Sequence, residues 1–85
     1  MPVELDGATA VLSGRVSVEE AEPLARWLRE TSDARVDLGA CEHLHTAAFQ
    51  ALFVARPVVA EPPTDPFLTR WILPLLTTHP AAVAA

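Results

Sequence analysis

The sequence predicts a small α/β domain, in which a mixed β-sheet of about four strands is packed with helices. Two observations lead to this prediction. Short segments typical of strands alternate with segments whose apolar residues recur at helical spacing, and Asp6-Gly7 joins the first two strand segments as a strong hairpin signal. The expected order is therefore β-β-α-β-α-β-α. At 85 residues the chain has room for one such domain, expected over residues 1–80, with residues 81–85 as a frayed tail.

The first half of the chain contains the hairpin and a helix. Residues 3–5 and 8–13 are the expected strands, and Gly14 is expected to separate the second strand from the helix. Residues 17–20 have the pattern of a capping box, in which a serine and a glutamate three residues later satisfy free amides at a helix start. Apolar residues then follow at helical spacing. Pro23 either bends this helix or marks its true beginning.

The second half predicts two more strands, each followed by a helix. Residues 34–38 are expected to form a central strand, and a loop over residues 39–45 leads from it into a helix over about 46–56. The apolar residues of that helix form a stripe expected to face the core, namely Ala48, Phe49, Leu52 and Phe53. Residues 57–60 predict a short parallel strand.

The last helix is expected to begin with a cap at Thr64 or Asp65 and to hold Pro66 in its first turn, where proline is tolerated. Pro74 is expected to kink its final turn. Its wide apolar face is expected to belong mostly to the core and comprises Phe67, Leu68, Trp71, Ile72, Leu75 and Leu76. Any part of that face, or of an edge strand, that stays uncovered would favour a homodimer.

Composition and charge exclude several classes of function. The net charge is −5, with eleven acidic residues against six arginines and no lysine, so the chain lacks the basic surface that nucleic-acid binding requires. A single cysteine, Cys41, rules out an internal disulfide framework, and no apolar run is long enough to span a membrane. Since no signal-peptide pattern is present either, we expect a cytoplasmic protein without membrane insertion. The preference for alanine, proline and arginine indicates a GC-rich bacterial genome.

Several segments resemble the STAS domain, the fold of the bacterial anti-sigma factor antagonists. The segments that carry the resemblance are residues 7–15 (GATAVLSGR), 17–21 (SVEEA), 36–41 (VDLGAC) and 44–49 (LHTAAF). The similarity extends over about residues 4–60, and relative to the family the last strand and helix are expected to be shortened. STAS domains also occur as partner subunits of bacterial ABC-type lipid transporters and as the tails of sulfate transporters.

The resemblance implies a function in signalling. In the antagonists, the loop before the corresponding helix carries a hydroxyl residue that a partner kinase phosphorylates, and Thr46 falls at that position. His45 stands where an acidic residue is usual, and Ala48 where glycine is usual. We therefore expect a non-enzymatic protein-interaction module that regulates transcription by docking on an anti-sigma-type kinase or another signalling protein. Its partner-binding residues are expected in the 39–50 loop and helix start, namely His43, His45, Thr46, Ala47 and Gln50.

Other interpretations remain open. Thr46 can serve simply as the N-cap of its helix. The chain can also be an accessory STAS subunit of a transport ATPase that uses the same surface. Finally, Cys41, His43 and His45 alternate along the predicted loop, a pattern that would let them bind zinc or a small ligand together. No cofactor is expected, and no catalytic residue is assigned, because the adjacent His45 and Thr46 lack a third orienting group.

Overall fold

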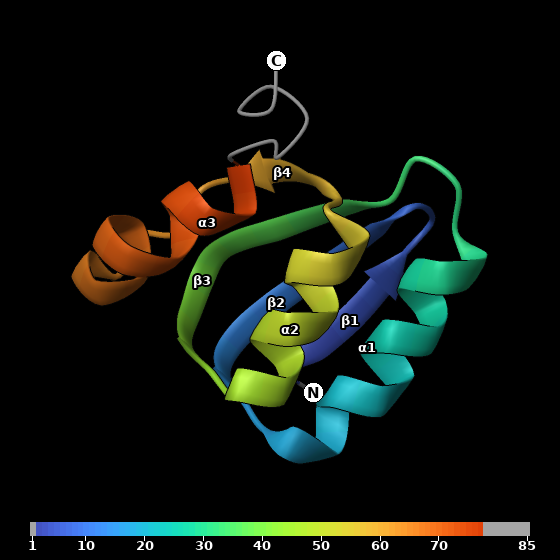
Figure 1. The fold of residues 1–85 in the computed structure, drawn as a ribbon, viewed down its shortest axis with the longest axis horizontal. Coiled ribbons are helices and arrows are strands. Elements are labelled where there is room, and N and C mark those ends of the chain that lie inside the picture. The colour runs from blue at the N-terminus through green and yellow to red at the C-terminus, as the bar shows by residue number, and fades with distance from the viewer. Residues whose placement is uncertain (1, 78–85) are drawn as a thin grey trace.

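The four-stranded mixed sheet that the sequence predicts is present in the computed structural model, which describes residues 2–77 (Figure 1). The strand order is β1-β2-β3-β4, with β1 antiparallel to β2 and the other two pairs parallel. In chain order the elements are β1 (Val3–Asp6), β2 (Thr9–Val16), α1 (Val18–Glu30), β3 (Arg35–Leu44), α2 (Thr46–Ala55), β4 (Val58–Glu61), the π-helical segment η1 (Leu68–Ile72) and α3 (Leu73–Thr77). None of the helices within these residues has the length and hydrophobicity that a membrane span requires. The tail expected over residues 81–85 lies outside the described residues.

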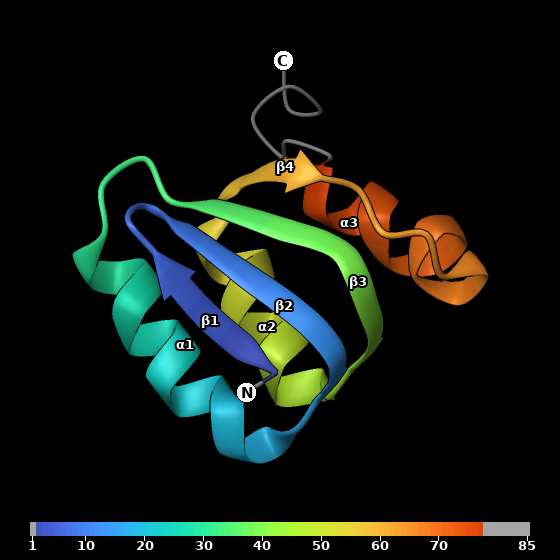
Figure 2. The same ribbon diagram turned by 180° about the vertical axis from the view of Figure 1, so that it is seen from behind.

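The two long helices, α1 and α2, lie on the same face of the sheet. Figure 2 shows the opposite face, where no helix lies in front of β1, β2 and β3. The core fills the space between the helices and the sheet, and its most deeply buried residues include Ala10, Leu12, Val36, Leu38, Leu24, Ala48 and Leu52. Side chains alternate along a strand, so every second residue of β1, β2 and β3 points to the opposite face of the sheet. The residues on that face include Glu4, Thr9, Arg35 and Asp37.

The predicted hairpin forms, but its turn residues are Gly7 and Ala8 and not the expected Asp6 and Gly7, because β1 continues to Asp6. Gly7 has a φ of 62°, a left-handed backbone conformation that glycine adopts without strain. The register pairs Asp6 with Thr9 on either side of the turn. A two-residue turn of this kind fits the right-handed twist of the two strands.

β2 continues past Gly14, so the expectation that Gly14 ends this strand is wrong. Gly14 pairs with Cys41, whereas the next residue, Arg15, pairs with His43, which leaves Glu42 as an extra residue on β3. This arrangement is a β-bulge. The φ of Gly14 is again 62°, and this left-handed backbone lets β2 remain paired with β3 up to its last residue.

β3 is also longer than predicted, and the expected loop over residues 39–45 is wrong. The strand runs to Leu44, so that one residue, His45, separates it from α2. The pattern of the sequence conceals the strand because Cys41 and Leu44 are both buried although they lie three residues apart. Only a strand with a bulge can direct both side chains to the core, and a simple two-residue alternation does not predict it.

The capping box at the start of α1 is confirmed. The backbone N–H and the hydroxyl of Ser17 both donate to Oε1 of Glu20, at 2.8 and 2.7 Å, and the N–H of Glu19 donates to the Ser17 hydroxyl at 3.3 Å. The hydrogen bonds from Ser17 hold the pKa of the Glu20 carboxyl below its usual value. The helix is continuous from Val18, so Pro23 lies inside it and does not mark its beginning.

The last helical segment begins at the predicted cap. Asp65, not Thr64, makes the capping contact: its Oδ2 accepts a hydrogen bond from the N–H of Leu68 at 3.0 Å. Pro74 lies in α3, which directly follows the π-helical segment η1. A π-helical turn widens the hydrogen-bonding ring and is one way for a helix to accommodate an interior proline.

The apolar face of this last segment belongs only partly to the core. Leu68 and Leu76 are buried, whereas Phe67, Trp71 and Leu75 are 61%, 56% and 48% exposed, so the expectation that Trp71 is a core residue is wrong. The segment lies beside β4 and α2 at the end of the sheet and meets the core on one side only (Figure 1). The three exposed residues recur every four positions and therefore share its other side.

Substitutions at Gly14 test the role of the bulge. We expect Gly14→Val to lower the free energy of unfolding by about 1–2 kcal/mol, because a β-branched side chain disfavours left-handed backbone. Gly14→Asn should lower it less, since asparagine tolerates that conformation. No atom lies within 4 Å of a Cβ built at Gly14, so steric overlap does not differ between the two variants. Urea denaturation measures both changes, and equal losses would contradict the backbone explanation.

Candidate functional site

The start of α2 is held by His45. The N–H of His45 donates to the carbonyl of Val16 at 2.9 Å, and its own carbonyl accepts from the N–H of Phe49 at 2.9 Å. Its Nδ1 accepts a hydrogen bond from the N–H of Ala47 at 3.0 Å, which makes His45 the N-cap of the helix. The interpretation of Thr46 as the N-cap is therefore wrong. Thr46 is the first residue of α2, and it is exposed.

A groove lies between α1 and α2. It encloses about 480 Å³, and most of its lining is apolar. The apolar lining comes from both helices and includes Val18, Ala21 and Ala25 of α1 and Ala47, Ala51 and Val54 of α2. Most of these side chains are short. They therefore leave part of the space between the solvent-facing sides of α1 and α2 unfilled, and this space is the groove.

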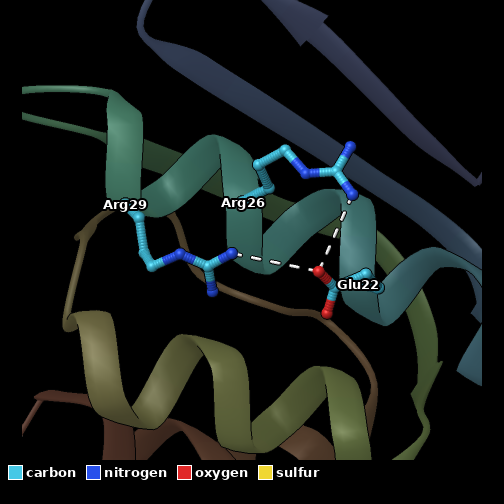
Figure 3. A network of polar contacts seen from close by, with 3 residues as sticks. All are labelled: Glu22, Arg26 and Arg29. Atoms are coloured by element: carbon cyan, nitrogen blue, oxygen red, sulfur yellow. Dashed lines mark ion pairs between the residues drawn. The ribbon is translucent and has the colours of Figure 1, made fainter.

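Polar residues also line this groove. Glu22 and Arg29 of α1 and Gln50 of α2 are among its lining residues. One carboxylate oxygen of Glu22 lies 3.7 Å from a guanidinium nitrogen of Arg26 and 3.9 Å from one of Arg29 (Figure 3). All three side chains are mostly exposed, so these ion pairs contribute little to stability. Little energy is therefore needed for them to exchange partners when another surface docks.

The predicted partner-binding residues fall into two places. Ala47 and Gln50 line the groove, and Thr46 precedes them at the helix start. His45 joins this group through its capping contact. His43 is instead part of β3, in register with Arg15, and does not line the groove. The structure thus places four of the five residues at the start of α2 and leaves the fifth on the sheet.

The sequence did not identify two valines of the groove as surface residues. Val18 and Val54 are 55% and 81% exposed, although valine is among the residue types most often buried. The signal that could have revealed Val54 is the composition of α2, in which Gln50 is the one polar residue after Thr46. A helix that is apolar on nearly every side has more apolar surface than one core can cover.

The side of α2 opposite the groove carries an aromatic cluster. Of the stripe expected to face the core, Ala48 and Leu52 are fully buried, but Phe53 is 39% exposed. Its ring packs at a tilt against Phe49, with 5.8 Å between the centroids, and the guanidinium of Arg56 lies 4.7 Å from the Phe53 centroid. Contacts of this type stabilise a partly exposed aromatic ring without removing it from solvent.

The hypothesis that Cys41, His43 and His45 share a metal is wrong. Cys41 is buried in the core, whereas both histidines are exposed. The bulge at Glu42 is the physical reason, because it interrupts the alternation that would have placed Cys41 and His43 on one side. Within residues 2–77 no group of three or more potential ligands is arranged to hold a metal ion. Burial also raises the pKa of the Cys41 thiol, which makes it a poor ligand and nucleophile.

No protein-family model, curated protein or solved structure matches the chain. The start of α2 and the groove beside it are therefore the structural features on which a functional proposal can rest.

Substitutions at His45 test its role as a cap. We expect His45→Ala to lower the free energy of unfolding by about 1 kcal/mol, because the N–H of Ala47 loses its acceptor. His45→Asn should preserve most of the stability, since asparagine is a good N-cap. Urea denaturation of the three proteins provides the measurement. A loss in the asparagine variant as large as that in the alanine variant would show that the imidazole acts through another contact.

Proposed function

We propose that this chain is a non-enzymatic protein-interaction module of the STAS type, similar to the anti-sigma factor antagonists. It acts in the cytoplasm and docks on a signalling protein, such as an anti-sigma-type kinase, through the start of α2 and the groove between α1 and α2. Phosphorylation of Thr46 switches this docking off.

The observation that carries the proposal is the exposure of Thr46, which directly precedes the groove residue Ala47 in the chain. Because His45 supplies the cap, the fold does not require the Thr46 hydroxyl for that role. The backbone around Thr46 is nevertheless held in place, since the preceding residue is hydrogen-bonded to both β2 and α2. An exposed hydroxyl on a rigid support is accessible to a kinase and lies where a docked partner would touch it.

A phosphate at Thr46 has a direct physical effect. It adds nearly two negative charges and three acceptor oxygens at the first residue of α2. The amides of the first helical turn and the positive end of the helix dipole favour the charge locally, so the helix itself tolerates the modification. A partner that packs on Ala47 and Gln50 would instead meet a new, strongly hydrated group at the end of its contact surface.

The groove has the composition of a contact surface. Alanine and valine make up most of its lining, and Glu22, Arg29 and Gln50 contribute the polar part. Protein–protein interfaces likewise combine apolar contact area with polar groups. This lining supplies packing area, and it favours recognition of another protein over chemistry on a small substrate.

Phosphorylation can be tested with an anti-sigma-type kinase from the same genome. After incubation with ATP, intact-mass measurement should show one added phosphate on the unmodified sequence and on Thr46→Ser. It should show none on Thr46→Val, which keeps the shape of threonine but lacks the hydroxyl. A phosphate on Thr46→Val would exclude Thr46 as the site. Partner binding without phosphate transfer would instead favour the accessory subunit of a transport ATPase.

Docking in the groove can be tested with two matched valine variants. Val54 lines the groove, whereas Val58 lies on β4, and both are more than half exposed. We expect Val54→Glu to weaken binding of the isolated partner at least about fivefold, because it places a charge in the apolar lining of the groove. Val58→Glu adds the same charge elsewhere and should leave the affinity unchanged. Isothermal titration calorimetry distinguishes the two, and equal affinities would place the interface outside the groove.

A further inference from the structure

The outer edge of β1 directs backbone groups away from the sheet. β1 is the first strand in the sheet order, and the N–H of Ser13 donates to the carbonyl of Pro2 at 2.8 Å. Bonded and non-bonded pairs alternate along an antiparallel ladder, so Glu4 also points its backbone groups towards β2. Val3 and Leu5 therefore direct their N–H and C=O groups outward. Such an edge is a template for another strand.

A pocket between β1 and α1 adjoins this edge. It encloses about 170 Å³. An apolar cavity of about 150 Å³ is large enough for a benzene ring, so this pocket has room for one aliphatic side chain. Its lining residues are Val3, Leu5, Glu19, Glu20, Pro23 and Leu24. Because α1 lies beside β1 at this end of the sheet (Figure 1 and Figure 2), a strand added to β1 would lie against α1.

Four acidic residues lie around this edge. Glu19 and Glu20 line the pocket, and Glu4 and Asp6 are exposed on β1 itself. Glu20 is engaged in the capping box, whereas Glu19 is exposed. Val3 and Leu5 line the pocket, and neighbouring side chains of a strand point to opposite faces of the sheet. The carboxylates of Glu4 and Asp6 therefore project from the face that does not carry the pocket. A segment placed along β1 would thus meet negative charge on both of its faces.

We propose that this edge is a second docking site, which takes an extended basic segment of a partner protein. The segment adds a fifth strand to the sheet and exchanges backbone hydrogen bonds with Val3 and Leu5. One of its aliphatic side chains enters the pocket, and its arginine or lysine side chains pair with the carboxylates of β1 and α1. Backbone bonds supply affinity in this mode of recognition, and the pocket and the charges supply specificity. The site does not depend on the function proposed for the start of α2.

A second copy of this chain fits the edge less well. Pairing of two β1 strands would bring Glu4 and Asp6 of one copy close to the same residues of the other. Like charges on directly neighbouring strands are destabilising. The charge of the edge therefore selects a basic partner in place of self-association.

A synthetic peptide that alternates valine with arginine is the probe for this site. Fluorescence anisotropy should show saturable binding to the full chain, and heteronuclear NMR should show its largest shifts at β1 and the first half of α1. The same peptide N-methylated on the amides of one edge should bind about two- to tenfold more weakly, because it loses hydrogen bonds to β1. Val3→Pro should weaken binding to a similar extent, since it removes an outward N–H and leaves the ladder with β2 intact.

Matched charge variants complete the test. Glu19→Gln should weaken peptide binding, whereas Glu42→Gln, an equal change on the exposed part of β3, should not. Val54→Glu should leave peptide binding unchanged, which separates this site from the α1–α2 groove. Equal binding of the methylated peptide, or equal effects of Glu19→Gln and Glu42→Gln, would overturn the proposal. So would sedimentation data showing a dimer that Val3→Pro dissociates.

Discussion

The parallel pairing of β2 with β3 determines where both long helices begin. At the end of this ladder the N–H of His45 donates to the carbonyl of Val16 at 2.9 Å, which ties the residue after β3 to the last residue of β2. Ser17 caps α1 directly after β2, and His45 caps α2 directly after β3. Because parallel strands end at the same edge of a sheet, the two helix starts come side by side. The groove and the exposed Thr46 are consequences of this arrangement.

Local signals predicted those parts of the fold that local interactions determine. The capping box of Ser17 and Glu20 and the hairpin at Gly7 are each stabilised by residues close in sequence. The capping box was predicted correctly, and the hairpin was predicted with its turn one residue too early. The second half of β3 depends on a distant partner, because Gly14 must take a left-handed conformation before the strand can continue opposite β2. Pairing between distant segments leaves no simple period in the sequence. For this reason a loop was predicted there and Cys41 was placed with two histidines.

The candidate site was predicted in composition but not in shape. Thr46, Ala47 and Gln50 were identified from the sequence, yet the groove beside them needs α1 as its second wall, and which side of α1 faces α2 follows only from packing. The exposure of apolar residues could not be predicted for the same reason, since it too depends on how the helices pack. Trp71 and Val54 have the composition of core residues, but a sheet of four strands offers too little surface to cover every side of the helices that carry them.

α1 supports both proposed docking surfaces, with different sides. Val18 and Ala25 face the groove, whereas Glu19 and Pro23 face the pocket beside β1. A ligand at one surface can alter affinity at the other only if the helix between them has two arrangements that the ligands distinguish. The bonds between Ser17 and Glu20 oppose such movement, since they fix the first turn of α1 to the end of β2. With that turn held, the two surfaces are expected to bind their partners independently.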